Sequence, residues 1–217
     1  MTHIYTSESV SEGHPDKVAD QISDAILDEL LEQDPESRVA VETMLAHGVA
    51  VVSGEVTTNA YVNVQEVIRQ TINSIGYNDT RVGFDGSTCG VLVAIQGQSN
   101  DIAQGVNTGG AGDQGMMFGL ATKETPQLMP LPLTIAHALT HKAAQVRHAN
   151  PSMGLRPDAK SQVSVVYEDG LPKRIETVVV SHQHDPTLQL ADIQSLVQDQ
   201  IIKPVLADYQ NFIDGDI

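Results

Sequence analysis

Cysteine, long apolar runs and leader-like segments are scarce or missing in this sequence of 217 residues. The single cysteine, Cys89, excludes an internal disulfide framework and suits a reducing compartment. No apolar run approaches the ~20 residues that a membrane-spanning helix needs. The first residues, Met1–Ser11, lack the charged-then-apolar pattern of a secretory signal peptide. We therefore expect a cytoplasmic protein without a membrane span.

Positive charge is also scarce, with 12 lysine and arginine residues against 28 aspartate and glutamate residues and a net charge of −16. Proteins bind duplex nucleic acid largely by neutralising its phosphates with lysine and arginine, so nucleic acid is excluded as an expected partner. A polyphosphate ligand stays compatible with this charge if metal cations bridge carboxylates to phosphate, or if another chain adds positive charge.

Hydrophobic periodicity predicts strand pairs and helices in alternation. Val18, Ile22, Ile26 and Leu30 recur at the spacing of one buried helix face, and Asp169-Gly170 predicts a hairpin turn. In chain order, we expect a helix over Asp16–Gln33, strands over Val39–Leu45 and Val49–Thr57, a helix over Val64–Ile75, a strand over Val91–Ile95, a glycine-rich loop over Gly97–Gly115, a helix over Pro132–His148, hairpin strands over Gln162–Tyr167 and Ile175–Ser181, and a helix over Leu190–Val205. This order predicts the α+β fold class.

Three short strings, far apart in the sequence, combine small or rigid backbone residues with an aspartate. They are Gly13–Lys17, Gly110–Gly115 and Arg156–Gln162, and the first and third also carry a lysine. Glycine lets the backbone approach an anion closely, aspartate holds a hard cation, and lysine neutralises phosphate oxygens. None of the strings is a Walker A loop or a dinucleotide-binding fingerprint. The combination favours a polyphosphate ligand with its divalent metal.

Several polar residues, within these strings and between them, can have a structural role in place of a functional one. His14 can cap a helix and Lys17 can be a solvated charge, although a helix N-terminus also attracts anions. Glu42 and Glu55 fall in strands of small and apolar residues. A carboxylate is rarely buried there without a partner, so a cation or an ammonium group is one expectation and a solvent-facing position is the other. Gln98, Asp101 and Asp113 border or occupy the glycine-rich loop, which fits a surface loop as well as a lid. Asp158 and Lys160 stand just before an expected strand, where a surface turn with a salt bridge is the alternative.

Five further histidines have no neighbouring cysteine or glutamate pattern of a zinc site. We interpret them as solvated or packing side chains: His137, His141, His148, His182 and His184.

Taken in order, the strings resemble S-adenosylmethionine synthetase (methionine adenosyltransferase). The resemblance runs from Thr6 to about Leu206, and Thr6–Lys17 and Ala19–Ala25 are similar to the family's opening almost letter for letter. Further matching pairs fall in family order: Glu42-Thr43, Gly54-Glu55, Gly76-Tyr77, Gln98-Ser99 and Asp101-Ile102. The resemblance implies repeated related α+β domains, each a sheet with helices packed on one face.

On this resemblance we expect an N-terminal α+β domain over residues 1–97, a glycine-rich active-site loop over residues 98–115 and a central α+β domain over residues 116–217. The sequence departs from the family pattern in two ways. The segment between Gly105 and Gly110 is shorter than the family's mobile loop. The sequence stops at Ile217, whereas family members continue into a third domain, so we expect either a fragment or a reduced variant.

The resemblance also implies roles for individual residues. His14 and Lys160 match catalytic positions, and Glu55 and Gln98 match contacts to methionine. The implied metal ligands are Asp16 for Mg²⁺, Glu42 for K⁺ and Glu8 for a metal or its surroundings. The implied nucleotide contacts are His14, Asp113, Asp158, Ala159 and Lys160.

The implied reaction is attack by the sulfur of L-methionine on C5′ of ATP. The whole triphosphate leaves and is hydrolysed to pyrophosphate and phosphate. A neutral thioether needs no general base, so the chemistry depends on alignment and on charge stabilisation of the triphosphate. Mg²⁺ and K⁺ are the implied cofactors, and a homodimer or tetramer with the active site between subunits is the implied assembly. The alternative is a non-catalytic fragment or interaction module of the same family, which needs another chain to complete the site.

Overall fold

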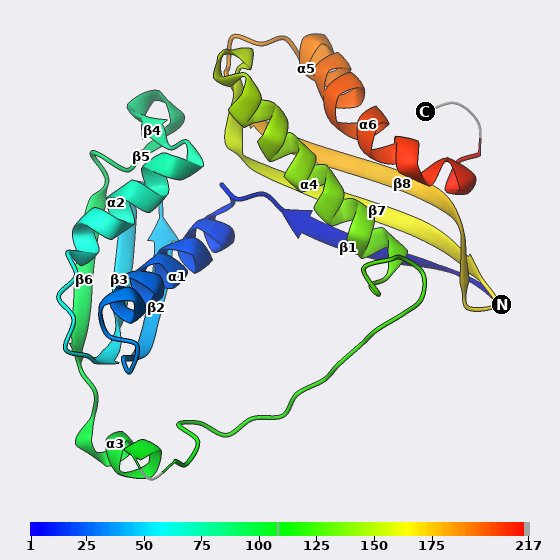
Figure 1. Ribbon diagram of the computed structural model, residues 1–217. Coiled ribbons are helices and arrows are strands. Elements are labelled where there is room, and N and C mark those ends of the chain that lie inside the picture. Colours follow the sequence, from blue (N-terminus) through cyan, green and yellow to red (C-terminus); the bar gives the residue numbers. More distant parts are fainter. Residues whose placement is uncertain (108, 215–217) are drawn as a thin grey trace. The chain divides into compact units, whose positions relative to one another are not determined.

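The computed structural model describes residues 1–107 and 109–214, and the chain forms two compact units (Figure 1). Unit 1 comprises Met1–His14 and Gly119–Ile217, and unit 2 comprises Pro15–Phe118. The helices are α1 (Pro15–Gln33), α2 (Val64–Ile75), α3 (Asn100–Asn107), α4 (Leu131–Ala149), α5 (Leu190–Val197) and α6 (Lys203–Leu206). The strands are β1 (Thr2–Val10), β2 (Arg38–Ala46), β3 (Val49–Thr57), β4 (Asn78–Asp79), β5 (Phe84–Asp85), β6 (Gly90–Gly97), β7 (Leu155–Glu168) and β8 (Leu171–His184). Short 3₁₀ segments are η1 (Thr80–Val82), η2 (Pro151–Met153) and η4 (Ala207–Phe212), and η3 (Gln198–Ile202) is a π-helix.

Unit 2 is built on a three-stranded sheet in the order β2-β3-β6, with α1 and α2 on one face (Figure 1). Strands β2 and β3 are antiparallel, whereas β3 and β6 are parallel. The predicted stripe of α1 (Val18, Ile22, Ile26 and Leu30) is buried in the core of this unit. Helix α2 ends at Gly76, whose left-handed conformation (φ 109°) lets its N–H bond back to the last turn.

Unit 1 is built on a three-stranded antiparallel sheet in the order β1-β7-β8, so the first strand of the chain pairs with a strand from its second half. Helices α4, α5 and α6 share one buried core with this sheet, in which Ile135, Val163 and Ile201 are fully buried. The hairpin from β7 to β8 turns at Asp169 (φ 51°) and Gly170 (φ 81°). Two successive left-handed residues are the pattern of a type I′ turn, so the predicted hairpin is confirmed.

The α+β fold class is confirmed, and most expected elements are present with small changes in their bounds. Part of the expected loop Gly97–Gly115 is instead helix α3. Its first turn carries Asp101, and an acidic side chain there stabilises a helix N-terminus. The expected final helix is divided into α5, η3 and α6. Pro204 lies at the start of α6, and a proline both lacks an N–H and clashes with the preceding turn, which the π-helix accommodates.

The third string also lies differently from the prediction. Asp158 and Lys160 are inside a strand and not before it, because β7 begins at Leu155 and pairs with β1 and β8. The same pairing places Met1–His14 in unit 1, and the expected N-terminal domain over residues 1–97 stays a prediction. The expected boundaries at residues 97 and 115 stay predictions, and Thr108, in the segment expected to be short, lies outside the described residues.

Candidate active site

The predicted site residues are divided between the two units. Unit 1 holds Glu8, His14, Asp158, Ala159 and Lys160, and unit 2 holds Asp16, Glu42, Glu55, Gln98 and Asp113.

In unit 1 the first and third strings lie side by side, because β1 runs antiparallel to β7 with Val10 opposite Lys160. Ser11 continues this pairing beyond the end of β1. Its N–H donates to the carbonyl oxygen of Ala159 (2.9 Å), and its hydroxyl donates to the carbonyl oxygen of Pro157 (2.7 Å). The same hydroxyl accepts from the N–H of Ala159 (2.8 Å). One buried serine therefore ties the backbone before His14 to the backbone of the third string.

Gly13 makes the closest approach between these strings. A Cβ at Gly13 would lie 2.3 Å from Cβ of Pro157 and 2.4 Å from its carbonyl carbon and oxygen, so only glycine fits there. The N–H of His14 then donates to the carbonyl oxygen of Ser11 (3.0 Å), which closes a tight turn. The backbone that presents His14 is thus anchored to β7 on both sides of Glu12.

Glu8 and Lys160 share the sheet face opposite α4. Ser9, next to Glu8, points toward α4, where its Oγ lies 2.8 Å from Nδ1 of His137. Because side chains alternate along a strand, Glu8 points to the other face, where it is exposed. Glu8 lies opposite Gln162 and is therefore a diagonal neighbour of Lys160, at a distance of about 7–8 Å. A carboxylate and an ammonium group thus border the same open surface.

Asp158 has an unsatisfied acceptor. Its Oδ1 is buried and has no hydrogen-bond partner among residues 1–107 and 109–214. An unpaired buried polar group lowers the stability of the fold by about 1–3 kcal/mol, so the unpaired oxygen of Asp158 needs an explanation. A bound ligand or cation that contacts this oxygen would supply one.

In unit 2 the two predicted methionine contacts are neighbours. Glu55 lies on β3, and Gln98 directly follows β6, the parallel neighbour of β3. The N–H of Ser99 donates to Oε2 of Glu55 (3.1 Å), and the hydroxyl of Thr57 donates to Oε1 of Gln98 (3.2 Å). These bonds hold the chain that leaves β6 against the end of β3.

Glu42 joins Glu55 on the sheet face opposite α1 and α2. Val52 is buried in the core with these helices, so its neighbour Ser53 and, by alternation, Glu55 point to the other face. Glu42 lies opposite Ser53 on β2. The two carboxylates are therefore diagonal neighbours on one face, about 7–8 Å apart.

The other two predicted ligands in unit 2 are exposed carboxylates. Asp16 lies in the first turn of α1, and Asp113 lies on the segment after α3, where its Oδ1 accepts from the N–H of Gln114 (2.7 Å). Within the described part of the chain, no three His, Cys, Asp or Glu side chains gather into a group that could hold a metal ion. A Mg²⁺ ion at Asp16 would need oxygen ligands from elsewhere, and substrate phosphates are their usual source at nucleotide sites.

Two models of known protein families match the chain. The family model for the S-adenosylmethionine synthetase N-terminal domain matches residues 2–100, and the model for the central domain of the same synthetase matches residues 108–216. The chain belongs to the S-adenosylmethionine synthetase family. The expected family is therefore confirmed. The N-terminal synthetase match includes β1, although β1 pairs with β7 from the central match.

Curated relatives agree with this assignment. The chain is 54% identical to the S-adenosylmethionine synthase of Kosmotoga olearia, over 98% of the chain and 57% of that protein. It is 52% identical to the S-adenosylmethionine synthase of Pseudothermotoga lettingae, over 96% of the chain and 57% of that protein. It is 54% identical to the S-adenosylmethionine synthase of Myxococcus xanthus, over 94% of the chain and 52% of that protein. The chain spans about half the length of the curated relatives it matches.

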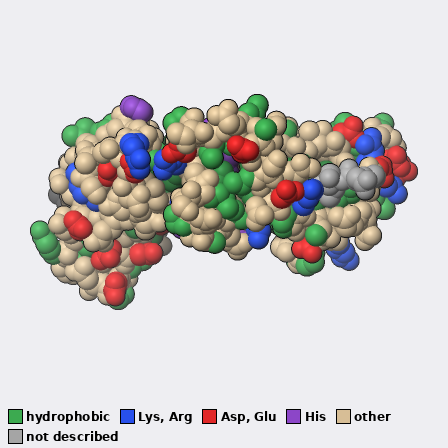
Figure 2. All heavy atoms as spheres, turned by 90° about the horizontal axis from the view of Figure 1, so that it is seen from above, with side chains coloured by type: hydrophobic (Ala, Val, Ile, Leu, Met, Phe, Trp, Pro, Cys, Tyr) green, Lys and Arg blue, Asp and Glu red, His purple; other side chains and the backbone are tan. Residues whose placement is uncertain are grey.

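The surface of the chain adds two observations. Figure 2 shows Asp and Glu side chains spread over the face drawn, and not gathered into one acidic patch. A search of the described residues finds no helix with the length and apolar character needed to cross a membrane.

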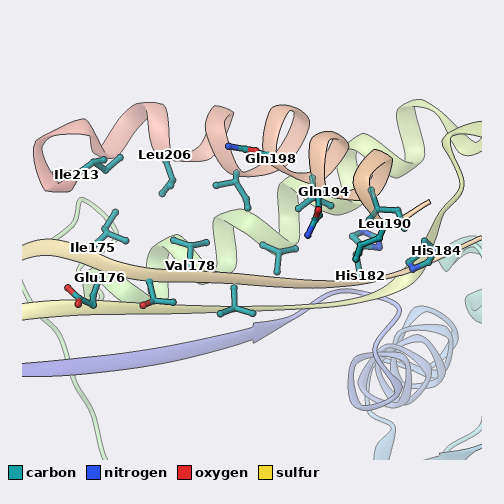
Figure 3. Close-up of a pocket in the computed structure, with 16 residues that line it drawn as sticks. Ile175, Glu176, Val178, His182, His184, Leu190, Gln194, Gln198, Leu206 and Ile213 are labelled. Carbon is teal, nitrogen blue, oxygen red and sulfur yellow. The ribbon is translucent and has the colours of Figure 1, made fainter. Parts of the chain in front are cut away.

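A groove in unit 1 lies apart from the predicted synthetase residues. It has a volume of about 860 Å³ and runs between β8 and the helices α5 and α6 (Figure 3). Its walls are largely aliphatic, as at Val178 and Leu206, and His182 and His184 lie toward one end. Burial lowers the pKa of the His182 imidazole from its usual 6.5. None of the predicted site residues lines this groove.

The sequence patterns missed a residue that supports the first synthetase string. Arg147 on α4 forms an ion pair with Glu12, and Nε2 of His148 lies 2.7 Å from the same carboxylate oxygen. No spacing rule connects Glu12 with a helix so far along the chain. The only available signal was the presence of basic residues in the last turn of an otherwise apolar-faced helix.

Proposed function

We propose that this chain contributes an active site that makes S-adenosylmethionine from L-methionine and ATP. In this reaction the methionine sulfur forms a bond to C5′ of ATP, and the bond from C5′ to oxygen breaks. The triphosphate leaves with the bonding electrons and is hydrolysed to pyrophosphate and phosphate. Family membership and the names of the relatives, which are S-adenosylmethionine synthases, support the proposal.

The observation that carries the proposal is the junction of the first and third strings in unit 1. His14 follows a turn that is bonded to Pro157 and Ala159, and Asp158 and Lys160 lie on the same strand. One small region therefore contains His14, Lys160 and Asp158, and Oδ1 of Asp158 is buried there without a hydrogen-bond partner among the described residues. This set suits a leaving triphosphate, because preorganised donors are most effective where charge develops in the transition state.

We assign separate roles to these residues. His14 donates a hydrogen bond to the leaving oxygen, and Lys160 neutralises the triphosphate. Asp158, Ala159 and Asp113 contact the nucleotide. Because the thioether of methionine is a neutral nucleophile, no residue has to remove a proton from it.

The methionine side of the proposed site lies in unit 2. Glu55 accepts from the ammonium group of methionine, and Gln98 contacts the same substrate. One oxygen of Glu55 already accepts from the N–H of Ser99. A carboxylate has about four acceptor positions, so this bond fixes its orientation and leaves capacity for the ammonium.

Asp16 would hold Mg²⁺ and Glu42 would hold K⁺, with Glu8 in the surroundings of a metal. A single exposed carboxylate fits Mg²⁺, which commonly binds through one or two carboxylates plus substrate phosphates. When bound, Mg²⁺ neutralises negative charge on the triphosphate. The cytoplasm is the proposed compartment, since a reducing environment suits the free thiol of Cys89.

The proposed assembly is a homodimer or tetramer with the site between subunits. Met44 and Leu92 are 59% and 60% exposed and, by strand register, share the unit 2 sheet face of Glu42 and Glu55. A large apolar side chain on such a face gains from burial against a second copy. Light scattering of the complete protein at micromolar concentration should give at least a dimer, and a monomer alone would contradict this part of the proposal.

The decisive experiment supplies the complete protein with ATP, L-methionine, Mg²⁺ and K⁺. Phosphate release is followed by a coupled assay, and S-adenosylmethionine is identified by mass spectrometry. We expect methionine-dependent phosphate release with S-adenosylmethionine as product, and a strong loss of both in Lys160→Met. If phosphate release did not depend on methionine and no S-adenosylmethionine were formed, the proposed function would be rejected.

The alternative is a module that needs another chain to complete the site. The net charge of −16, with only 12 lysine and arginine residues, favours it for these 217 residues by themselves, because a triphosphate needs more positive charge than they offer. On this alternative, the 217 residues expressed alone show no turnover, and adding the complete protein in an inactive Lys160→Met form restores it.

A further inference from the structure

We propose that Arg147 is a positioning residue that sets the orientation of His14 through Glu12. The inference rests on the proposed role of His14 at the leaving triphosphate. It adds to the site a residue from α4, outside the three strings.

Arg147 is a buried cation with a specific partner. It lies in the last turn of α4 and is only 7% exposed. Its Nη2 donates to Oε1 of Glu12, and Nε2 of His148 lies 2.7 Å from that same oxygen. Two side chains of one helix turn therefore converge on one oxygen of the turn before His14.

The contacts of this turn reach two elements. Ser11 is bonded to Pro157 and Ala159, and Gly13 is packed against Pro157, so both contacts are with β7. The side chain of Glu12 reaches instead to α4, where it pairs with Arg147. Only Gly13 separates Glu12 from His14, so a displacement of Glu12 also moves the backbone that carries the imidazole.

A purely stabilising role explains the pair less well. Burying a guanidinium removes it from water, and the attraction to a partner often does no more than offset that loss. Well-packed apolar side chains at such positions commonly give equal stability. The geometric role, in contrast, uses the planar and pre-organised guanidinium of arginine, whose Nη2 holds Oε1 of Glu12 in one place.

The test is a double-mutant cycle in the complete protein. The variants are Arg147→Met, His14→Asn and the double variant, with Arg147→Lys as the conservative change. Arg174→Gln is the control, because Arg174 forms an ion pair with Glu176 on β8, away from the turn. We expect Arg147→Met to lower kcat by about 10- to 100-fold, the size of effect that a small misplacement causes, with little change in KM for ATP. Arg147→Lys should recover part of the loss, and the double variant should be no slower than His14→Asn.

A second measurement is independent of activity. The NMR signal of the His14 imidazole, identified by its loss in His14→Asn, should shift in Arg147→Met and stay in place in Arg174→Gln. Glu12→Gln should reproduce the shift and provides the same test if Arg147→Met fails to fold. The inference would be overturned if the loss of kcat in the double variant equalled the product of the losses in Arg147→Met and His14→Asn. It would also be overturned if the His14 signal did not shift in Arg147→Met. An inactive wild-type protein with a shifted signal would instead reject the proposed function and retain the positioning role.

Discussion

The two units hold their predicted functional residues in different ways. In unit 1, the turn before His14 is tied to β7 through the buried Ser11 and the close contact at Gly13, and to α4 through Glu12. In unit 2, the side chains of Glu55 and Gln98 accept from Ser99 and Thr57, and the N–H of Gln98 donates to the carbonyl oxygen of Val56. The contacts in unit 1 therefore reach two elements, β7 and α4, whereas those in unit 2 join the segment after β6 to β3.

This difference matches the two tasks that we propose. Charge on the leaving oxygen develops only in the transition state, so the groups that stabilise it must be fixed in advance. A residue that binds the ammonium group of methionine interacts in the ground state and tolerates some adjustment. We therefore assign the triphosphate side to the fixed residues of unit 1 and the methionine side to unit 2.

The largest expected effect is on turnover. His14→Asn should lower kcat by about 10²- to 10³-fold, the usual cost of losing a preorganised hydrogen-bond donor, and leave ATP binding and the Mg²⁺ requirement nearly unchanged. Steady-state kinetics with varied ATP and Mg²⁺ would show this. Equal losses in ATP affinity and in turnover would identify His14 as a ground-state contact.

Asp16→Asn is the matched comparison, because Asp16 lies two residues from His14 in the sequence. It keeps the shape of the side chain but removes the charge that attracts a hard cation. The Mg²⁺ concentration for half-maximal activity should rise in this variant and stay constant in His14→Asn.

The next effect is on stability. Gly13→Ala should lower the free energy of unfolding by about 2 kcal/mol, within the usual range for overpacking, because the added Cβ meets the backbone of Pro157. Gly54→Ala should cost at least as much in unit 2, where φ is 153° and the Cβ would lie 2.0 Å from the carbonyl oxygen of Ala40. Gly119→Ala, with open space around it, is the control. Urea unfolding compares the three, and equal midpoints for Gly13→Ala and Gly119→Ala would exclude the proposed close contact.

The smallest expected effect is a pH dependence of unit 1. Burial lowers the pKa of folded His182 from 6.5, so the unfolded chain binds a proton at a higher pH than the folded one. The free energy of unfolding should therefore fall as pH drops from about 7 through the ordinary histidine range toward the lower folded pKa. His182→Gln should flatten this slope. An unchanged slope in His182→Gln would show that this histidine is not the cause.

Local sequence signals predicted most of the fold because the relevant interactions are local. The stripe of α1, the end of α2 at Gly76 and the turn at Asp169-Gly170 each depend on neighbouring residues. The pairing of β1 with β7 was not predictable in this way, since it joins opposite ends of the chain. The same limit applies to the site. The three strings carry the family resemblance, but the ion pair of Glu12 with Arg147 depends on how α4 packs.

The division of tasks between the units is tested most directly by crossed binding measurements. Calorimetry would give the affinity of Glu55→Gln and Lys160→Met for L-methionine and for a non-hydrolysable ATP analogue with Mg²⁺. Glu55→Gln should weaken methionine binding by about 30-fold or more, as expected for loss of a charge pair, and leave the analogue unaffected. Lys160→Met should weaken binding of the analogue and leave methionine unaffected. If either variant weakened both ligands equally, the assignment of one substrate to each unit would be wrong.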